Sequence, residues 1–248
     1  MKQIRSLMPV SSEGLDKLAA ELLNENIQVN DNVQAGNNPP KNPKDYIILE
    51  TADSKDNKIG LYVAKTKEFF NKNWYEAHEA LAKENSQMLT IRQGIDLIKL
   101  LKSGKVYDGL KSKLNDAEIV QLLNEIAEVR SPWRAEWLDG RFVQKDDEWH
   151  LLQGHKYNAS KSGKLEDKII AGNNVKINPI IKNFYFNIND ADKYGLPTKE
   201  GKGLYYWHPT NESVARFIAY SDGAGLNCNR VPSNSYSDLW VRRAKIKG

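Results

Sequence analysis

The chain has 248 residues, of which 40% are hydrophobic and 27% charged, and its formal net charge is +4 because 36 basic residues face 32 acidic ones. This composition predicts a globular protein with a sizeable core, formed by one large domain or by one domain with a helical extension. The lysines are scattered among acidic residues rather than clustered, which argues against a nucleic-acid-binding protein, and a few basic residues at the C-terminal end are weak evidence for one.

The start of the chain contains no apolar stretch of signal-peptide length, and no run approaches about eighteen apolar residues. We therefore expect synthesis in the cytoplasm and no insertion into a membrane, with any display outside the cell by a route that the sequence does not show. The localisation stays open. The single cysteine, Cys228, excludes an intramolecular disulfide, so the fold must be stable without one.

The residue pattern divides the chain into two parts. Residues 1–44 are predicted to hold a helix, capped by Ser11 or Ser12 and ending near Asn24, followed by a linker rich in Asn and Pro over residues 26–44. The proline pair at 39–40 predicts an extended linker. Residues 45–248 are predicted to form the folded domain.

The front half of this domain alternates strands and capped helices. Residues 45–51 and 59–64 are predicted strands joined by a polar turn at 53–57. Three helices are predicted at 74–84, 91–103 and 116–128, with Asn73, Thr90 and Asn115 as their N-caps and apolar residues at helical spacing. A short extended piece at 88–90 lies between the first two helices.

After Pro132 the chain turns to short aromatic strands, and we expect their aromatic residues to lie in the core. These strands are predicted around Trp133, Trp137, Phe142, Trp149, 169–170, 184–186 and 203–207. Many short elements with a large irregular share indicate the α+β fold class.

The most informative run lies near the C-terminus. From Ile218 to Asp238 there is no Lys, Glu, Gln, Met or Trp, although about five such residues would be expected in a window of this length. Randomising the two adenines of an Asn codon gives fifteen amino acids, and none of these five types is among them. The residues reachable in this way are Ile218, Tyr220, Asp222, Gly223, Gly225, Val231, Tyr236 and Asp238, with Asn227, Asn229 and Asn234 as unmutated positions.

The run also has a fixed frame, Ala215-Arg-Phe-x-Ala-x-Ser-x-x-Ala-x-Leu-Asn-Cys-Asn-Arg-x-Pro-Ser-Asn-Ser-x-Ser-x-Leu-x-Val-Arg242. This frame resembles the variable region of proteins diversified by diversity-generating retroelements, in their archaeal and viral branch. The resemblance covers about thirty residues. Trp240 departs from it, since many relatives carry Gly there; because Trp cannot arise from an Asn codon by adenine change, we interpret it as scaffold.

The resemblance implies a C-type lectin fold over residues 45–248, with short helices, a small twisted antiparallel sheet, much irregular loop and chain termini that meet. Trp74, Ala77, Leu89 and Thr90 match the front half of such domains more loosely. The variable region, about residues 211–245, would be a long irregular loop held on the scaffold, a setting that tolerates side-chain change.

Within this region the resemblance implies that fixed residues point inward and variable residues point outward as one ligand-binding surface. Phe217, Ala219, Ala224, Leu226, Cys228 and Leu239 would be inward, Val241 would lie in a final strand, and Arg216 and Arg242 would donate to loop carbonyls. The eleven residues reachable or unmutated at Asn codons would be outward, with tyrosines as rigid contact area. The partner would be a protein or cell-surface ligand, bound by a monomer without a cofactor.

The sequence gives little support for metal binding, catalysis or calcium-dependent sugar binding. The four histidines, His78, His150, His155 and His208, share no metal-ligand spacing, so neither a metal site nor a catalytic site is expected. The acidic groups at 146–148 and 190–192 favour solvated turns over calcium sites. No Glu-Pro-Asn or Trp-Asn-Asp motif is present, which disfavours calcium-dependent sugar binding. Cys228 is predicted to be a buried thiol. The alternatives are a fixed lectin-like module and an enzyme of the formylglycine-generating type, although the latter relies on paired cysteines.

Overall fold

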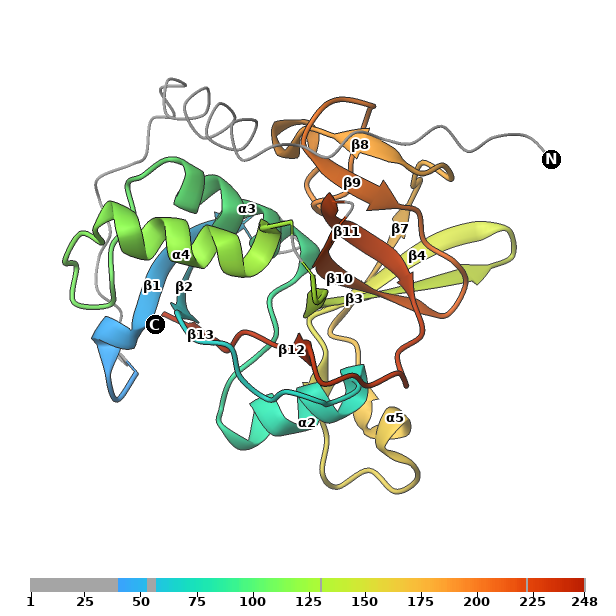
Figure 1. Ribbon diagram of the computed structural model, residues 1–248. Coiled ribbons are helices and arrows are strands. Elements are labelled where there is room, and N and C mark those ends of the chain that lie inside the picture. Colours follow the sequence, from blue (N-terminus) through green and yellow to red (C-terminus); the bar gives the residue numbers. More distant parts are fainter. Residues whose placement is uncertain (1–39, 53–56, 130, 222, 248) are drawn as a thin grey trace.

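A computed structural model describes residues 40–52, 57–129, 131–221 and 223–247. The predicted N-terminal helix, most of the predicted linker and the turn at 53–56 lie outside these residues. The fold is a mixed α+β arrangement of short helices and β-sheets, as the sequence predicts (Figure 1). The end of the predicted linker is not extended: Pro43–Asp45 (η1) forms one 3-10 turn, which a proline near the first position permits.

All three predicted helices are confirmed, and each begins at its predicted cap. They are α2 (Trp74–Lys83), α3 (Ile91–Lys102) and α4 (Asp116–Ala127). Each has a complete capping box, in which the side chain of Asn73, Thr90 or Asn115 accepts the backbone N–H three residues later. The further helical turns are short: α5 (Leu165–Lys168) and η2 (Ile188–Asp190). None of the helices in the described ranges is long and apolar enough to cross a membrane.

A three-stranded antiparallel sheet joins the beginning and the end of the domain. Strand β2 (Lys58–Ala64) pairs with β1 (Tyr46–Ala52) on one side and with β13 (Ala244–Ile246) on the other. The first and last strands of the described chain therefore lie in one sheet, as expected for a domain whose termini meet.

The main sheet is larger than predicted, and it is not wholly antiparallel. Seven of its eight strands follow the order β7 (Asn173–Ile177), β4 (Glu148–Gln153), β3 (Arg134–Lys145), β10 (Ser213–Tyr220), β11 (Gly223–Arg230), β9 (Leu204–Trp207) and β8 (Phe184–Phe186). The eighth, β12 (Leu239–Trp240), runs parallel to β3. A second parallel pair arises because the β10–β11 hairpin returns β11 to a place beside β9. Strands β5 (Lys156–Tyr157) and β6 (Ile169–Ile170) form a separate pair.

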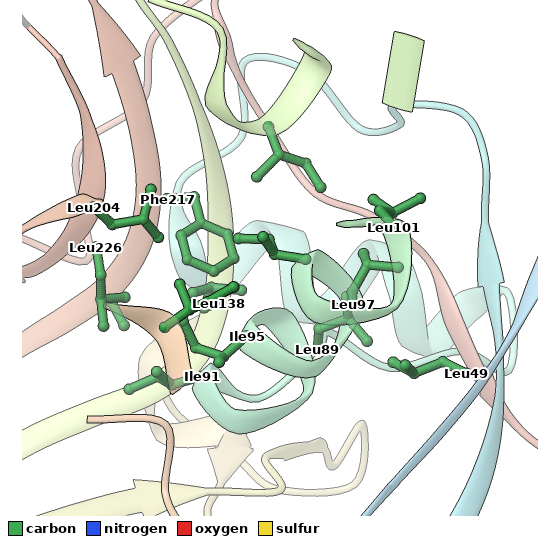
Figure 2. Close-up of a cluster of buried hydrophobic side chains, with 14 of the residues drawn as sticks. Leu49, Leu89, Ile91, Ile95, Leu97, Leu101, Leu138, Leu204, Phe217 and Leu226 are labelled. Carbon is green, nitrogen blue, oxygen red and sulfur yellow. The ribbon is translucent and has the colours of Figure 1, made fainter. Parts of the chain in front are cut away.

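The principal core lies between the two sheets, where α3 contacts both β1 and β3. Figure 2 shows Ile91 and Ile95 of α3 on the side of Phe217. Leu97 and Leu101 lie on the other side, nearer to Leu49 of β1. Helix α3 therefore carries apolar residues on two sides, as a helix packed between two sheets requires.

A second core covers the opposite face of the main sheet near β3 and β10. There α2 contributes Trp74 and Leu81, which belong to one buried cluster with Trp137 and Ile218. Near β3 and β10 the sheet is therefore buried on both faces. Toward β9 and β8 the same face becomes partly exposed, with Tyr185 at 40% exposure.

Candidate functional site

The predicted variable region is mostly not a loop. Its first part forms the β10–β11 hairpin inside the main sheet, and its longest irregular part is residues 231–238, ahead of β12. The expectation of one long irregular loop is therefore wrong for residues 213–230. The physical reason is that residues 214–220 are almost continuously apolar, with Arg216 the exception, which suits a strand that is buried on both faces.

Strand alternation separates the residues of this hairpin into two sets. The register pairs Ile218 with Gly225 and Tyr220 with Gly223, so these predicted variable positions share one face of the sheet. Phe217 pairs with Leu226 on the other face, where both belong to the principal core. Ala219, Ala224 and Cys228 share that inner face, because strand residues two apart point the same way. The fixed positions predicted to point inward do so.

Three predicted variable positions are nevertheless buried, so the expectation that all of them are exposed is wrong. Ile218 is 8% exposed because the second core covers it. Asn227 is also 8% exposed, and its side chain accepts the backbone N–H of Asn229 at 3.2 Å.

Gly225 is buried for a different reason: β9 lies directly against it. A Cβ at this position would lie 2.1 Å from the Tyr205 carbonyl oxygen and 2.7 Å from a ring carbon of Trp207. Any side chain there would require backbone movement, so Gly225 is a structural glycine rather than a ligand-contacting residue.

The remaining predicted positions are accessible. Tyr220, Gly223 and Asn229 are half-buried along the hairpin. The 231–238 loop carries Val231 and Tyr236, which are 53% and 39% exposed, and the half-buried Asn234 and Asp238. Asp222 lies outside the described residues. The accessible part of the predicted surface is therefore the outer half of the hairpin together with this loop.

A row of aromatic side chains from β8 and β9 extends this face and meets Tyr220 of the variable region. The sequence pattern did not predict this row. The ring centroids of Tyr185 and Tyr205 are 4.8 Å apart, those of Tyr205 and Trp207 are 4.6 Å apart, and those of Trp207 and Tyr220 are 5.9 Å apart. The assignment to the core is wrong for Tyr185 and Tyr205, because Leu204 and Tyr206 fill the inner positions of β9. Trp207 packs against the second core and is partly buried. The available signal was strand geometry, which places Tyr205 and Trp207 on one face and Leu204 and Tyr206 on the other.

Two guanidinium groups and two rings form a cluster beside this row. Arg216 lies over the Trp133 ring at 5.6 Å, and Trp133 contacts Tyr236 edge to face at 5.4 Å. Arg230 lies over the Tyr236 ring at 4.9 Å and donates to its hydroxyl at 2.5 Å. These contacts tie the 231–238 loop to β10 and β11.

The two arginines predicted to donate to loop carbonyls behave differently. Arg242 donates to the carbonyls of Ala64 and Lys65 at 2.9 Å each, as predicted, and its Nε donates to the Glu136 carboxylate at 3.2 Å. Arg216 is 5% exposed, and its Nε and Nη1 have no hydrogen-bond partner within the described parts of the chain. Burial, with a smaller effect of Arg230, lowers the pKa of Arg216 to about 9.

The other scaffold predictions can be checked directly. Cys228 is fully buried, and burial raises the pKa of its thiol, which confirms a structural thiol. Trp240 is 1% exposed, which fits a scaffold residue. Val241 makes only an isolated bridge with Glu68, so the final strand is β13 instead. Asp146 and Asp147 form the turn between β3 and β4, as expected.

The histidines are less separate than the sequence indicates. His78 and His155 are both buried and both lie beside Asp139, a grouping that their sequence spacing does not indicate. Sequence spacing could not reveal this cluster, because its three members come from different elements.

A scan against known protein-family models, a search of curated proteins and a search of solved structures find no match to this chain.

Proposed function

We propose that the chain is a ligand-binding protein whose contact surface is the outer face of the β10–β11 hairpin and the 231–238 loop. In this proposal, adenine-specific mutagenic retrohoming by a diversity-generating retroelement of archaeal or viral type varies the residues of that surface. The scaffold is a C-type lectin fold, supported by the pairing of β13 with β2, which brings the ends of the domain together.

One observation carries the proposal. The variable positions were assigned from the residue types and the sequence frame, whereas the two faces of the hairpin follow from strand pairing. The two assignments agree: Tyr220 and Gly223 share the outer face, and the fixed Phe217 and Leu226 share the core face. A protein that must tolerate many side chains requires this separation, because core positions accept few changes without loss of stability.

The accessible surface has suitable chemistry for recognition. Tyrosine and tryptophan rings supply rigid contact area with few torsions to restrict, and the three rings outside the variable region, Tyr185, Tyr205 and Trp207, would be present in every variant. The half-buried Arg230, whose guanidinium group lies over the Tyr236 ring, adds a positive charge beside these rings, which suits a carboxylate on the ligand. The partner is a protein or cell-surface ligand, bound by a monomer without nucleic acid or a cofactor.

The alternative classes have less support. An enzyme of the formylglycine-generating type relies on paired cysteines, whereas Cys228 is the sole cysteine and is buried. A fixed lectin-like module remains the alternative if the surface does not vary.

Deep sequencing of codons 211–245 from the source population tests the proposal. We expect changes confined to adenines of Asn-type codons at the outer positions, with the codons of Phe217 and Leu226 unchanged. Gly225 should stay glycine among variants that fold, because β9 leaves no room for a side chain. Codons that are uniform across the population would refute the retroelement and leave a fixed domain.

A further inference from the structure

Three buried side chains from distant parts of the chain meet at one side of a cavity of about 1060 Å³. His78 lies on α2, Asp139 lies on β3, and His155 follows β4. His155 Nδ1 is 2.5 Å from Asp139 Oδ1, and His78 Nε2 is 3.8 Å from the same oxygen. None of the three residues is more than 7% exposed. This cavity is distinct from the outer face of the β10–β11 hairpin.

The hydrogen bonds of the chain explain only part of this cluster. The His155 backbone N–H donates to Asp139 Oδ2 at 2.9 Å, which fixes the carboxylate and accounts for the Asp139–His155 pair. The His78 side chain, however, is only 3% exposed, and its Nε2 has no hydrogen-bond partner among the described residues. Gln153 Oε1 lines the same cavity and is also without a partner. Two such atoms in one place are unusual, because nearly all buried polar atoms in native proteins are satisfied.

The donor set fits a transition metal. Two imidazole nitrogens and one carboxylate oxygen lie within 4.8 Å of one another. Ligands about 2.0–2.2 Å from a tetrahedral zinc ion are roughly 3.3–3.5 Å apart. Metal binding would therefore replace the hydrogen bond between His155 Nδ1 and Asp139 Oδ1, release its proton to solvent and move these two atoms about 1 Å further apart. Three protein ligands leave a fourth position for water, as in zinc sites that stay open.

The surroundings would hold such a ligand set in place. The Trp74 ring contacts both imidazoles, with centroids 4.2 Å from His78 and 4.8 Å from His155. Its indole N–H donates to the Leu138 carbonyl at 2.9 Å, beside Asp139. Packing of this kind limits the rotamers of the ligands, which favours a preformed site over a chance grouping.

We propose that His78 Nε2, Asp139 Oδ1 and His155 Nδ1 bind one divalent transition-metal ion of the zinc type, with a fourth position open to the cavity that Gln153 lines. The ion would complete the bonding of His78 and would join α2 to β3. The inference does not depend on the proposed ligand-binding surface.

The test uses the full chain, freed of metal with a chelator and then titrated with Zn²⁺ by calorimetry. Titration with Co²⁺, followed by visible absorption, reports the coordination number. We expect one equivalent of each ion to bind, a higher melting temperature with zinc, and a Co²⁺ spectrum of low coordination number. Absence of stoichiometric binding by either ion would overturn the proposal.

Variants locate the site. His78→Leu should fold without metal at least as well as the wild type, because His78 Nε2 makes no hydrogen bond that leucine would remove. Its zinc affinity should fall by more than about 100-fold, beyond the effect of losing a residue that only supports a ligand. His150→Leu is the matched control, since His150 bonds to Asn174 outside this cluster. Wild-type zinc affinity in His78→Leu, or an equal loss in His150→Leu, would refute the assignment.

Discussion

The substitution Gly225→Ala tests the contact between β11 and β9. The added Cβ would lie 2.1 Å from the Tyr205 carbonyl oxygen and 2.7 Å from the Trp207 ring. This is more than about 1 Å inside ordinary contact distance, so β9 would have to retreat from β11. That movement would weaken the parallel pairing of Gly225, Leu226 and Asn227 with β9. Overpacking costs about 1–3 kcal/mol and each weakened hydrogen bond up to about 1 kcal/mol, so we expect a loss of about 3 kcal/mol.

Urea unfolding followed by tryptophan fluorescence measures this loss as a lower midpoint at an unchanged slope. The control is Gly60→Ala, another strand glycine, whose added Cβ would meet only the flexible side chain of Lys247 at 3.1 Å. We expect this control to change stability by less than about 1 kcal/mol. A wild-type midpoint for Gly225→Ala would show that β9 does not constrain this position, and Gly225 would then return to the set of variable residues.

Three further substitutions or reactions test the scaffold. Cys228, which is buried, should resist a thiol reagent in the native protein and react fully in urea; rapid labelling without denaturant would contradict its burial. Arg242→Met should cost about 3–5 kcal/mol by urea unfolding because it leaves Glu136 buried without its partner, and adding Glu136→Gln should recover part of the loss; additive losses would refute the pairing. Asn115→Ala should cost about 1 kcal/mol in the same assay through loss of the α4 cap, whereas Asn115→Asp should be nearly neutral. Equal stability of the two variants would show that the cap does not stabilise α4.

The helices could be predicted because their signals are local. Asn73, Thr90 and Asn115 each accept a backbone N–H three residues later, so the caps that begin each helix can be recognised in the sequence around them. The α+β class follows from the same local information. None of this depends on distant contacts.

Strand partners and the buried cluster could not be predicted in this way. Strand β9 meets β11 only after the hairpin has returned, and no short-range pattern specifies that parallel pair. The same holds for His78 and Asp139, which are 61 positions apart and are brought together by the packing of α2 on the main sheet. Spacing identifies metal ligands only when they share one element or one turn.

The hairpin itself, however, leaves a trace in the frame of the variable run. Fixed and variable positions alternate from Phe217 to Tyr220, with the variable ones at even numbers. After the adjacent variable positions 222 and 223, they alternate again from Ala224 to Asn229, with the variable or Asn positions at odd numbers. The phase changes where β10 ends and β11 begins, which agrees with the register that pairs even-numbered Ile218 and Tyr220 with odd-numbered Gly225 and Gly223. A long loop would impose no such period, so the frame supports the proposed placement of the variable positions on one face of a strand pair.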